Sequence, residues 1–130
     1  MNIGVVCGSF HRDKVEQMLE YACSSAEINQ INISEIVWVP GSMEIPLALQ
    51  RLLIRDDIDA AACLSIIEKG ETQHGLAMGM GVISSILELQ LSTGKPIGLG
   101  IIGPGAEPEH IGPRLELHAR AAIEANAAML

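Results

Sequence analysis

Four short apolar segments alternate with longer segments of helical periodicity, and this alternation restricts the fold of the chain more than any other feature. The apolar segments cover residues 3–7, 33–39, 60–67 and 96–102. Between and after them, apolar side chains recur at helical spacing over residues 13–26, 42–55, 73–91 and 115–129. A strand that is apolar on both faces needs a helix on each face. The order βαβαβαβα therefore predicts an α/β fold, a three-layer αβα sandwich around a four-stranded parallel sheet. A length of 130 residues fits a single domain, residues 1–130.

Charge and cysteine content exclude several classes of function. A net charge of −8 argues against a nucleic-acid partner, which needs a basic face, and against an anionic membrane surface. The uncharged segment over residues 75–87 is too short to span a bilayer. The three cysteines form no CxxC pair, so neither a zinc site nor a disulfide framework is predicted. Free thiols and an N-terminus without a signal-peptide pattern are typical of a cytoplasmic protein.

The segment over residues 73–91 is apolar on almost every side. Its apolar side chains are Ala77, Met78, Met80, Val82, Ile83, Ile86, Leu87, Leu89 and Leu91. A helix of this kind is buried all round, and a sheet of four strands covers only part of it. We therefore expect contacts between identical subunits to cover the remainder. The alternative is a helix packed entirely within the core of one chain.

Four strand-to-helix junctions should lie together, because the carboxyl ends of parallel strands meet at one edge of the sheet. The junctions carry Gly8-Ser9-Phe10-His11, Pro40-Gly41-Ser42-Met43-Glu44, Gly70-Glu71-Thr72-Gln73-His74, and Gly103-Pro104-Gly105 followed by Arg114. Together they offer an aromatic ring, a carboxylate, an anion cradle, an imidazole and a guanidinium.

The third junction is the most informative of the four. Gly70 lets the backbone approach a ligand closely, and the N–H groups of a starting helix, with the Thr72 hydroxyl, attract an anion. His74 titrates near neutral pH and can move protons, so the junction favours chemistry on a small phosphorylated molecule. Each residue also has a structural alternative: Thr72 as a helix cap, His74 on the surface, Phe10 in the core, Glu44 as a first-turn carboxylate, and Arg114 as an ion-pair partner.

Four of these segments, in this order, carry a resemblance to a known family. Residues 39–46 (VPGSMEIP) are similar to Val-Pro-Gly-Ala-Phe-Glu-Ile-Pro, and residues 70–74 (GETQH) match Gly-Glu-Thr-x-His. Residues 4–10 (GVVCGSF) look like a first strand that ends in Phe, and residues 100–105 (GIIGPG) look like an archaeal Gly-Pro-Gly loop before the last helix. The chain thus resembles the lumazine synthase family over nearly its whole length.

The resemblance implies a flavodoxin-like strand order and a reaction. In this family a ribitylamino-pyrimidinedione amine condenses with 3,4-dihydroxy-2-butanone 4-phosphate. Imine formation, loss of phosphate, ring closure and dehydration then give 6,7-dimethyl-8-ribityllumazine, without a metal or an organic cofactor. Family members form pentamers, some of which build larger shells, and their active sites lie between adjacent subunits. A helix that is apolar all round agrees with such an assembly.

The resemblance also implies which residues bind the pyrimidine substrate. Phe10 would stack on its ring, and Glu44 would accept hydrogen bonds from the ribityl hydroxyls, assisted by the backbone of Ser42 and Met43. Leu99 stands where many members place a Phe near the pyrimidine.

The remaining implied contacts concern the pyrimidinedione edge and the phosphate. The backbone near Ile67 and Glu68 would contact that edge, and His74 would shuttle protons as phosphate leaves. The phosphate would be held by Gly70, Glu71, Thr72 and, from the neighbouring subunit, Arg114.

Several positions depart from the family pattern. His11 stands where Asn often follows the Phe, Met43 stands for a second Phe, and His118 lies where a Lys is expected. Gly112-Pro113 precedes Arg114, and Pro in this position predicts that the last helix begins there.

Two other functions remain open at this stage. An archaeal riboflavin synthase shares the fold and a similar pentamer, but it uses two lumazine molecules and needs no phosphate site, so residues 70–74 speak against it. A shell or storage protein that binds flavin precursors without turnover is the second alternative, because the chain has few aromatic residues.

Overall fold

The computed structural model describes all 130 residues and contains one sheet of four parallel strands. They are β1 (Asn2–Gly8), β2 (Asn32–Val39), β3 (Ala60–Glu68) and β4 (Ile97–Ala106), in the spatial order β2-β1-β3-β4. β1 pairs in parallel with both β2 and β3, so the strand order reverses between β1 and β3. The predicted α/β class, parallel sheet and flavodoxin-like order are confirmed.

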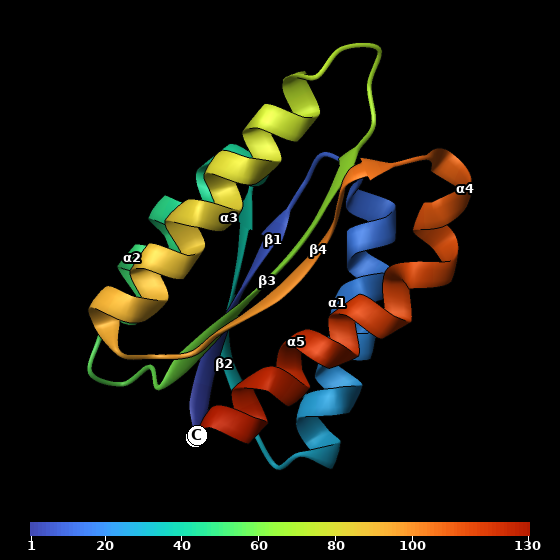
Figure 1. Cartoon of the computed structure of the whole chain (residues 1–130). Coiled ribbons are helices and arrows are strands. Elements are labelled where there is room, and N and C mark those ends of the chain that lie inside the picture. The colour runs from blue at the N-terminus through green and yellow to red at the C-terminus, as the bar shows by residue number, and fades with distance from the viewer.

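Helices cover both faces of the sheet. α1 (Arg12–Ile28) and α5 (Leu115–Met129) lie on one face, and α2 (Ile45–Leu53) and α3 (His74–Thr93) lie on the other (Figure 1). A short helix, α4 (Pro108–Ile111), and two 3-10 turns, η1 (Ser42–Glu44) and η2 (Gly112–Arg114), complete the chain. The predicted three layers are therefore present.

Two apolar layers, one on each face of the sheet, hold the sandwich together. Successive side chains along a strand point to opposite faces and therefore enter different layers. Val5 and Leu64 point toward Met18 of α1 and Ile123 of α5, and all four side chains are buried. The opposite layer joins Val6 and Cys63 to the buried leucines and isoleucines of α2 and α3. Burial of aliphatic side chains on both faces is the main source of stability, since the chain has few aromatic rings.

Strand β4 continues beyond its predicted end. Residues 103–105 were expected to form a loop, and that prediction is wrong because β4 runs through them to Ala106. Gly103 and Gly105 take φ values of +99° and +90°, which glycine tolerates best. They let the register shift between Ile66 and Glu68 and allow pairing to resume at Glu68 and Ala106.

The predicted helix over residues 42–55 is divided and shorter. A 3-10 turn precedes α2, and Pro46 lies in the first turn of the helix, where its missing N–H costs no hydrogen bond. The helix ends at Leu53, where the ammonium group of Lys95 donates to the carbonyl oxygens of Leu53 (2.9 Å) and Arg55 (2.8 Å). Near Pro113 the chain forms η2, and α5 begins only at Leu115.

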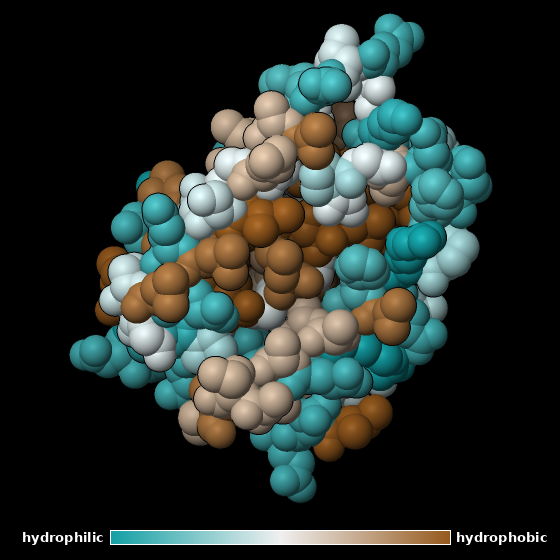
Figure 2. Space-filling model, in the orientation of Figure 1, coloured by the Kyte–Doolittle hydropathy of each residue, from teal (hydrophilic) through white to brown (hydrophobic).

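Most of helix α3 is exposed in the single chain. Its buried residues are Gly79, Val82 and Ile86, while Met80 and Leu87 are exposed. The alternative of a helix packed wholly within one core is therefore wrong. At 20 residues and a mean hydropathy of 1.3, α3 is long and apolar enough, by length and composition alone, to cross a membrane. Figure 2 shows a hydrophobic band on the face between α3 and α5.

Candidate active site

A cavity of about 380 Å³ lies at the carboxyl edge of the sheet, where the strand order reverses. This is the position at which open α/β sheets bind ligands. Its walls come from the junctions after β1, β2 and β3 and from the first turns of α3. The lining residues are Phe10, Gly41, Ser42, Ile66, Ile67, Glu68, Gly70, Thr72, His74, Gly75 and Met78.

A pair of serines fixes the floor of the cavity. The hydroxyl oxygens of Ser42 and Ser65 lie 2.7 Å apart, and both side chains are buried. Gly8 makes this approach possible, because a Cβ atom there would lie 2.6 Å from the Ser65 hydroxyl. The backbone of the second junction is thus tied to β3, and Ser42 is held at the cavity wall.

The predicted anion cradle and the imidazole lie together at one end of the cavity. Gln73, one residue beyond Thr72, is the N-cap of α3, and the Thr72 hydroxyl accepts a hydrogen bond from the His74 backbone N–H at 3.2 Å. Thr72 therefore caps the first N–H of α3 from one residue before the N-cap position, as the structural alternative predicts, and it lines the cavity as well. Gly70, Thr72 and His74 all line the cavity, and all three residues are solvent-exposed.

Phe10 and Glu68 also line the cavity. The Phe10 ring is 76% exposed, which excludes the alternative of a core phenylalanine. Glu68 is the last residue of β3, and its carboxylate oxygen lies 3.2 Å from Nε2 of His11. An exposed apolar ring at the rim of a cavity is a platform for a planar ligand.

Five of the predicted residues do not line this cavity. Met43 and Glu44 belong to the 3-10 turn η1, and both side chains face solvent. Glu71 is exposed in the loop before α3. Leu99, 39% exposed, lies in the middle of edge strand β4, and Arg114 lies in η2, where its guanidinium donates to the carbonyl oxygen of His110 at 2.9 Å.

Sequence reasoning missed several residues of the cavity. Gly75 and Met78 follow His74 on the first turns of α3, and their helical spacing was the available signal. For Ile66 the sequence indicates only that it belongs to an apolar strand, and it gives no sign that the residue lines a cavity. Ser65 contacts Ser42 across 23 positions of sequence, and no local pattern indicates that contact.

The cysteines and the histidine near Arg114 have shifted pKa values. Burial raises the pKa of the Cys7 and Cys63 thiols to about 12, so both stay protonated and act as core side chains. Burial, with the Arg114 charge nearby, lowers the pKa of His118. No three His, Cys, Asp or Glu side chains are grouped as metal ligands.

The His118 shift predicts a pH effect on stability. A histidine whose pKa is lowered by folding binds its proton more tightly in the unfolded chain, so stability falls as pH drops through the unfolded value near 6.5. The variant His118→Gln should lose that part of the acid sensitivity. The measurement is urea unfolding of both proteins at pH 7.5 and 5.5. An equal loss of stability in the two proteins would contradict the assignment.

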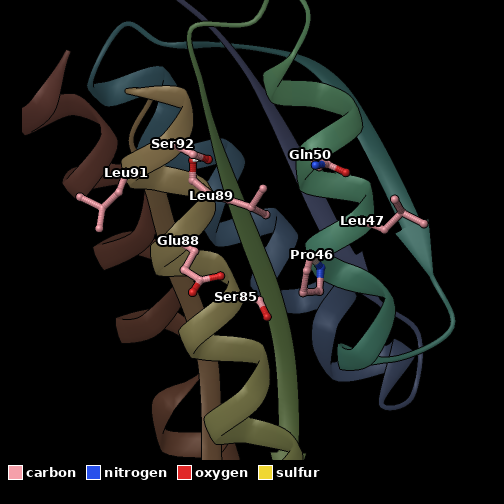
Figure 3. Close-up of a pocket in the computed structure, with 8 residues that line it drawn as sticks. All are labelled: Pro46, Leu47, Gln50, Ser85, Glu88, Leu89, Leu91 and Ser92. Carbon is pink, nitrogen blue, oxygen red and sulfur yellow. Dashed lines mark hydrogen bonds between the residues drawn. The ribbon is translucent and has the colours of Figure 1, made fainter.

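A larger hollow on the molecule lacks the chemistry of a site. The groove between α2 and α3 has a volume of about 800 Å³ and is lined by Pro46, Leu47, Gln50, Ser85, Glu88, Leu89, Leu91 and Ser92 (Figure 3). Glu88 is its one ionisable residue, and no imidazole or cysteine lines it. The cavity at the sheet edge is therefore the better candidate.

The fold is that of a flavodoxin-like α/β protein whose candidate ligand site lies at the strand-order reversal. Comparison with known proteins makes the class specific. All residues from 1 to 130 match the model of the 6,7-dimethyl-8-ribityllumazine synthase family. The chain belongs to this family, and its activity is that of a lumazine synthase, an enzyme of riboflavin biosynthesis.

Individual relatives agree with this assignment over nearly the full chain. The chain is 39% identical to the 6,7-dimethyl-8-ribityllumazine synthase of Metallosphaera sedula over 124 residues, which are 95% of this chain and 82% of the relative. It is also 39% identical to that of Staphylothermus marinus (98% and 85%). The Saccharolobus solfataricus synthase is 36% identical (96% and 81%). The archaeal resemblance drawn from residues 100–105 is consistent with these relatives.

Proposed function

We propose that the cavity at the sheet edge condenses the ribitylamino-pyrimidinedione amine with 3,4-dihydroxy-2-butanone 4-phosphate to give 6,7-dimethyl-8-ribityllumazine. One observation carries the proposal: Gly70 and Thr72, the imidazole of His74 and the exposed ring of Phe10 all line one cavity. A phosphate site, a proton carrier and a stacking platform are what this condensation requires. The enzyme would work in the cytoplasm, consistent with its free thiols.

The chemistry divides between the two ends of the cavity. The pyrimidine would stack on Phe10, with the backbone of Ile67 and Glu68 at its edge, while the phosphate would sit against Gly70 and the Thr72 hydroxyl. The amine nitrogen attacks the ketone carbon, and water leaves to form the imine. A proton is then lost from carbon as phosphate departs, and ring closure releases a second water.

His74 would serve the proton transfers of this sequence. It lies at the start of α3, directly after the phosphate cradle, and lines the same cavity as Phe10. An imidazole in that place can accept the carbon-bound proton and donate one to the departing phosphate.

Two further contacts would come from a neighbouring subunit. Leu99 and Arg114 lie outside the cavity of their own chain, and both side chains are exposed. A ring of five subunits would place them beside the next cavity, with Arg114 paired to the phosphate and Leu99 against the pyrimidine. The exposed side of α3 and the α2–α3 groove would supply contact area for such a ring, since both are rich in apolar side chains.

A charge on α3 should disrupt this assembly. Met80 is 64% exposed on the apolar side of the helix, so Met80→Glu should yield smaller species or aggregates, because an unpaired carboxylate would be buried in the interface. Analytical ultracentrifugation measures the outcome, with Gln17→Glu on the exposed side of α1 as the charge-matched control. A wild-type chain that sediments as a stable monomer at micromolar concentration would contradict the assembly and its shared sites.

Turnover distinguishes the proposed function from its rivals. The wild-type protein is mixed with the pyrimidine amine and the butanone phosphate, and lumazine absorbance is followed. A lumazine synthase forms lumazine from the two substrates. A riboflavin synthase instead consumes lumazine and forms riboflavin, and a storage protein binds lumazine without turning it over.

A further inference from the structure

The stacking ring at the cavity has one aromatic neighbour. Phe10 is three-quarters exposed, and the imidazole of His11 meets it edge-on, with ring centroids 4.9 Å apart and ring planes at 88°. An exposed phenylalanine loses rotational freedom when a ligand stacks on it. A neighbouring ring that already fixes its orientation reduces that loss.

His11 also lies against the end of a second strand, β3. Its side chain is 19% exposed, and Nε2 is buried at 3.2 Å from the Glu68 carboxylate, although the pair is not aligned as a hydrogen bond. The carboxylate is 29% exposed and lines the cavity. The backbone carbonyl of His11 accepts the Val15 N–H in the first turn of α1. The imidazole thus bridges the β1–α1 junction and the end of β3.

We propose that His11 is a positioning residue for the pyrimidine substrate. Its ring packs edge-on against Phe10 and sets the angle of that ring, and its Nε2, 3.2 Å from the carboxylate, lies against Glu68 at the cavity wall. The Phe10 ring and the Glu68 carboxylate are then already in place before a ligand binds. The ring can stack on a planar heterocycle, and the carboxylate can accept hydrogen bonds from N–H groups of that heterocycle. The inference rests on the proposed function, because the planar ligand is the pyrimidine of that reaction.

The test compares His11→Ala, His11→Phe and Glu68→Gln in the intact protein. His11→Ala should raise KM for the pyrimidine about three- to tenfold, the range expected for one aromatic pair. KM for the butanone phosphate and kcat should stay unchanged. His11→Phe keeps a ring edge against Phe10 and should restore part of the loss. Glu116→Gln, whose carboxylate pairs with Arg120 on α5, is the matched control for Glu68→Gln.

A double variant tests whether the two residues act together. If His11 and Glu68 hold each other in place, the double variant should raise the pyrimidine KM by less than the product of the two single effects. Fully additive effects would overturn the pairing. An unchanged pyrimidine KM in His11→Ala, or a loss confined to kcat, would overturn the positioning role.

A binding measurement separates this inference from the proposed function. Equilibrium titration with 6,7-dimethyl-8-ribityllumazine gives a Kd that does not depend on turnover. Absence of turnover in the wild type would refute the proposed function alone. An equal lumazine Kd in wild type and His11→Ala would refute the positioning role alone.

Discussion

Replacing His74 with alanine should slow lumazine formation by roughly ten- to a thousandfold, the loss expected for one general acid–base group. The effect should fall short of complete inactivation because, on the proposed function, Phe10 and the Gly70–Thr72 segment would still hold the two substrates together. The measurement is kcat at saturating concentrations of both substrates, with lumazine absorbance as the readout.

The His74→Ala variant should remain folded and assembled. The side chain is exposed at the first residue of α3 and packs against no core residue, and its backbone N–H keeps the bond to Thr72. Gln73→Ala is the matched control, because Gln73 is the exposed neighbour and does not line the cavity. An unchanged kcat in His74→Ala would remove the imidazole from the mechanism.

Sequence patterns were sufficient for the elements that local chemistry determines. The four strands were predicted because each is a continuous apolar run. The grouping of Gly70, Thr72 and His74 at one cavity was predicted because they are neighbours in sequence, and phosphate binding there stays a prediction. The loop predicted at residues 103–105 was wrong for a physical reason: glycines at positive φ can bulge a strand as readily as end it.

Contacts between distant residues were beyond the reach of such patterns. Ser42 meets Ser65, and His11 meets Glu68, only because parallel strands bring their carboxyl ends to one edge. A local pattern predicts that edge, yet it does not predict which side chains touch there.

The predicted site also extends past the boundary of one chain. Within the chain, Arg114 bonds to the His110 carbonyl and does not line the cavity, although the charge of the substrate calls for a cation. An acidic protein must bind the phosphate dianion against its own average field, and salt screens that field within about 8 Å. Donors adjacent to the phosphate therefore decide whether it binds.

Arg114 variants should weaken binding of the butanone phosphate and leave binding of the pyrimidine little changed. Arg114→Ala removes charge-assisted hydrogen bonds worth about 1.5–3 kcal/mol, so KM for the butanone phosphate should rise at least about tenfold. Arg114→Lys keeps the charge but loses the planar fork and should fall between alanine and wild type. Arg120→Ala on α5 is the control. If an Arg114 variant weakened binding of the pyrimidine alone, the assignment of Arg114 to the phosphate would be wrong.

Mixed assemblies would show whether Arg114 acts on a neighbouring cavity. When His74→Ala and Arg114→Ala chains are unfolded and refolded together in equal amounts, some cavities combine an intact His74 from one chain with an intact Arg114 from the next. Random mixing in a ring makes about a quarter of the sites complete, so activity measured well below the wild-type KM for the butanone phosphate, where both single variants are slow, should return to about that fraction of wild type. If Arg114 serves its own cavity, every site carries one of the two defects, and mixing restores nothing. Recovery in the mixture would therefore establish that the active site is shared between subunits.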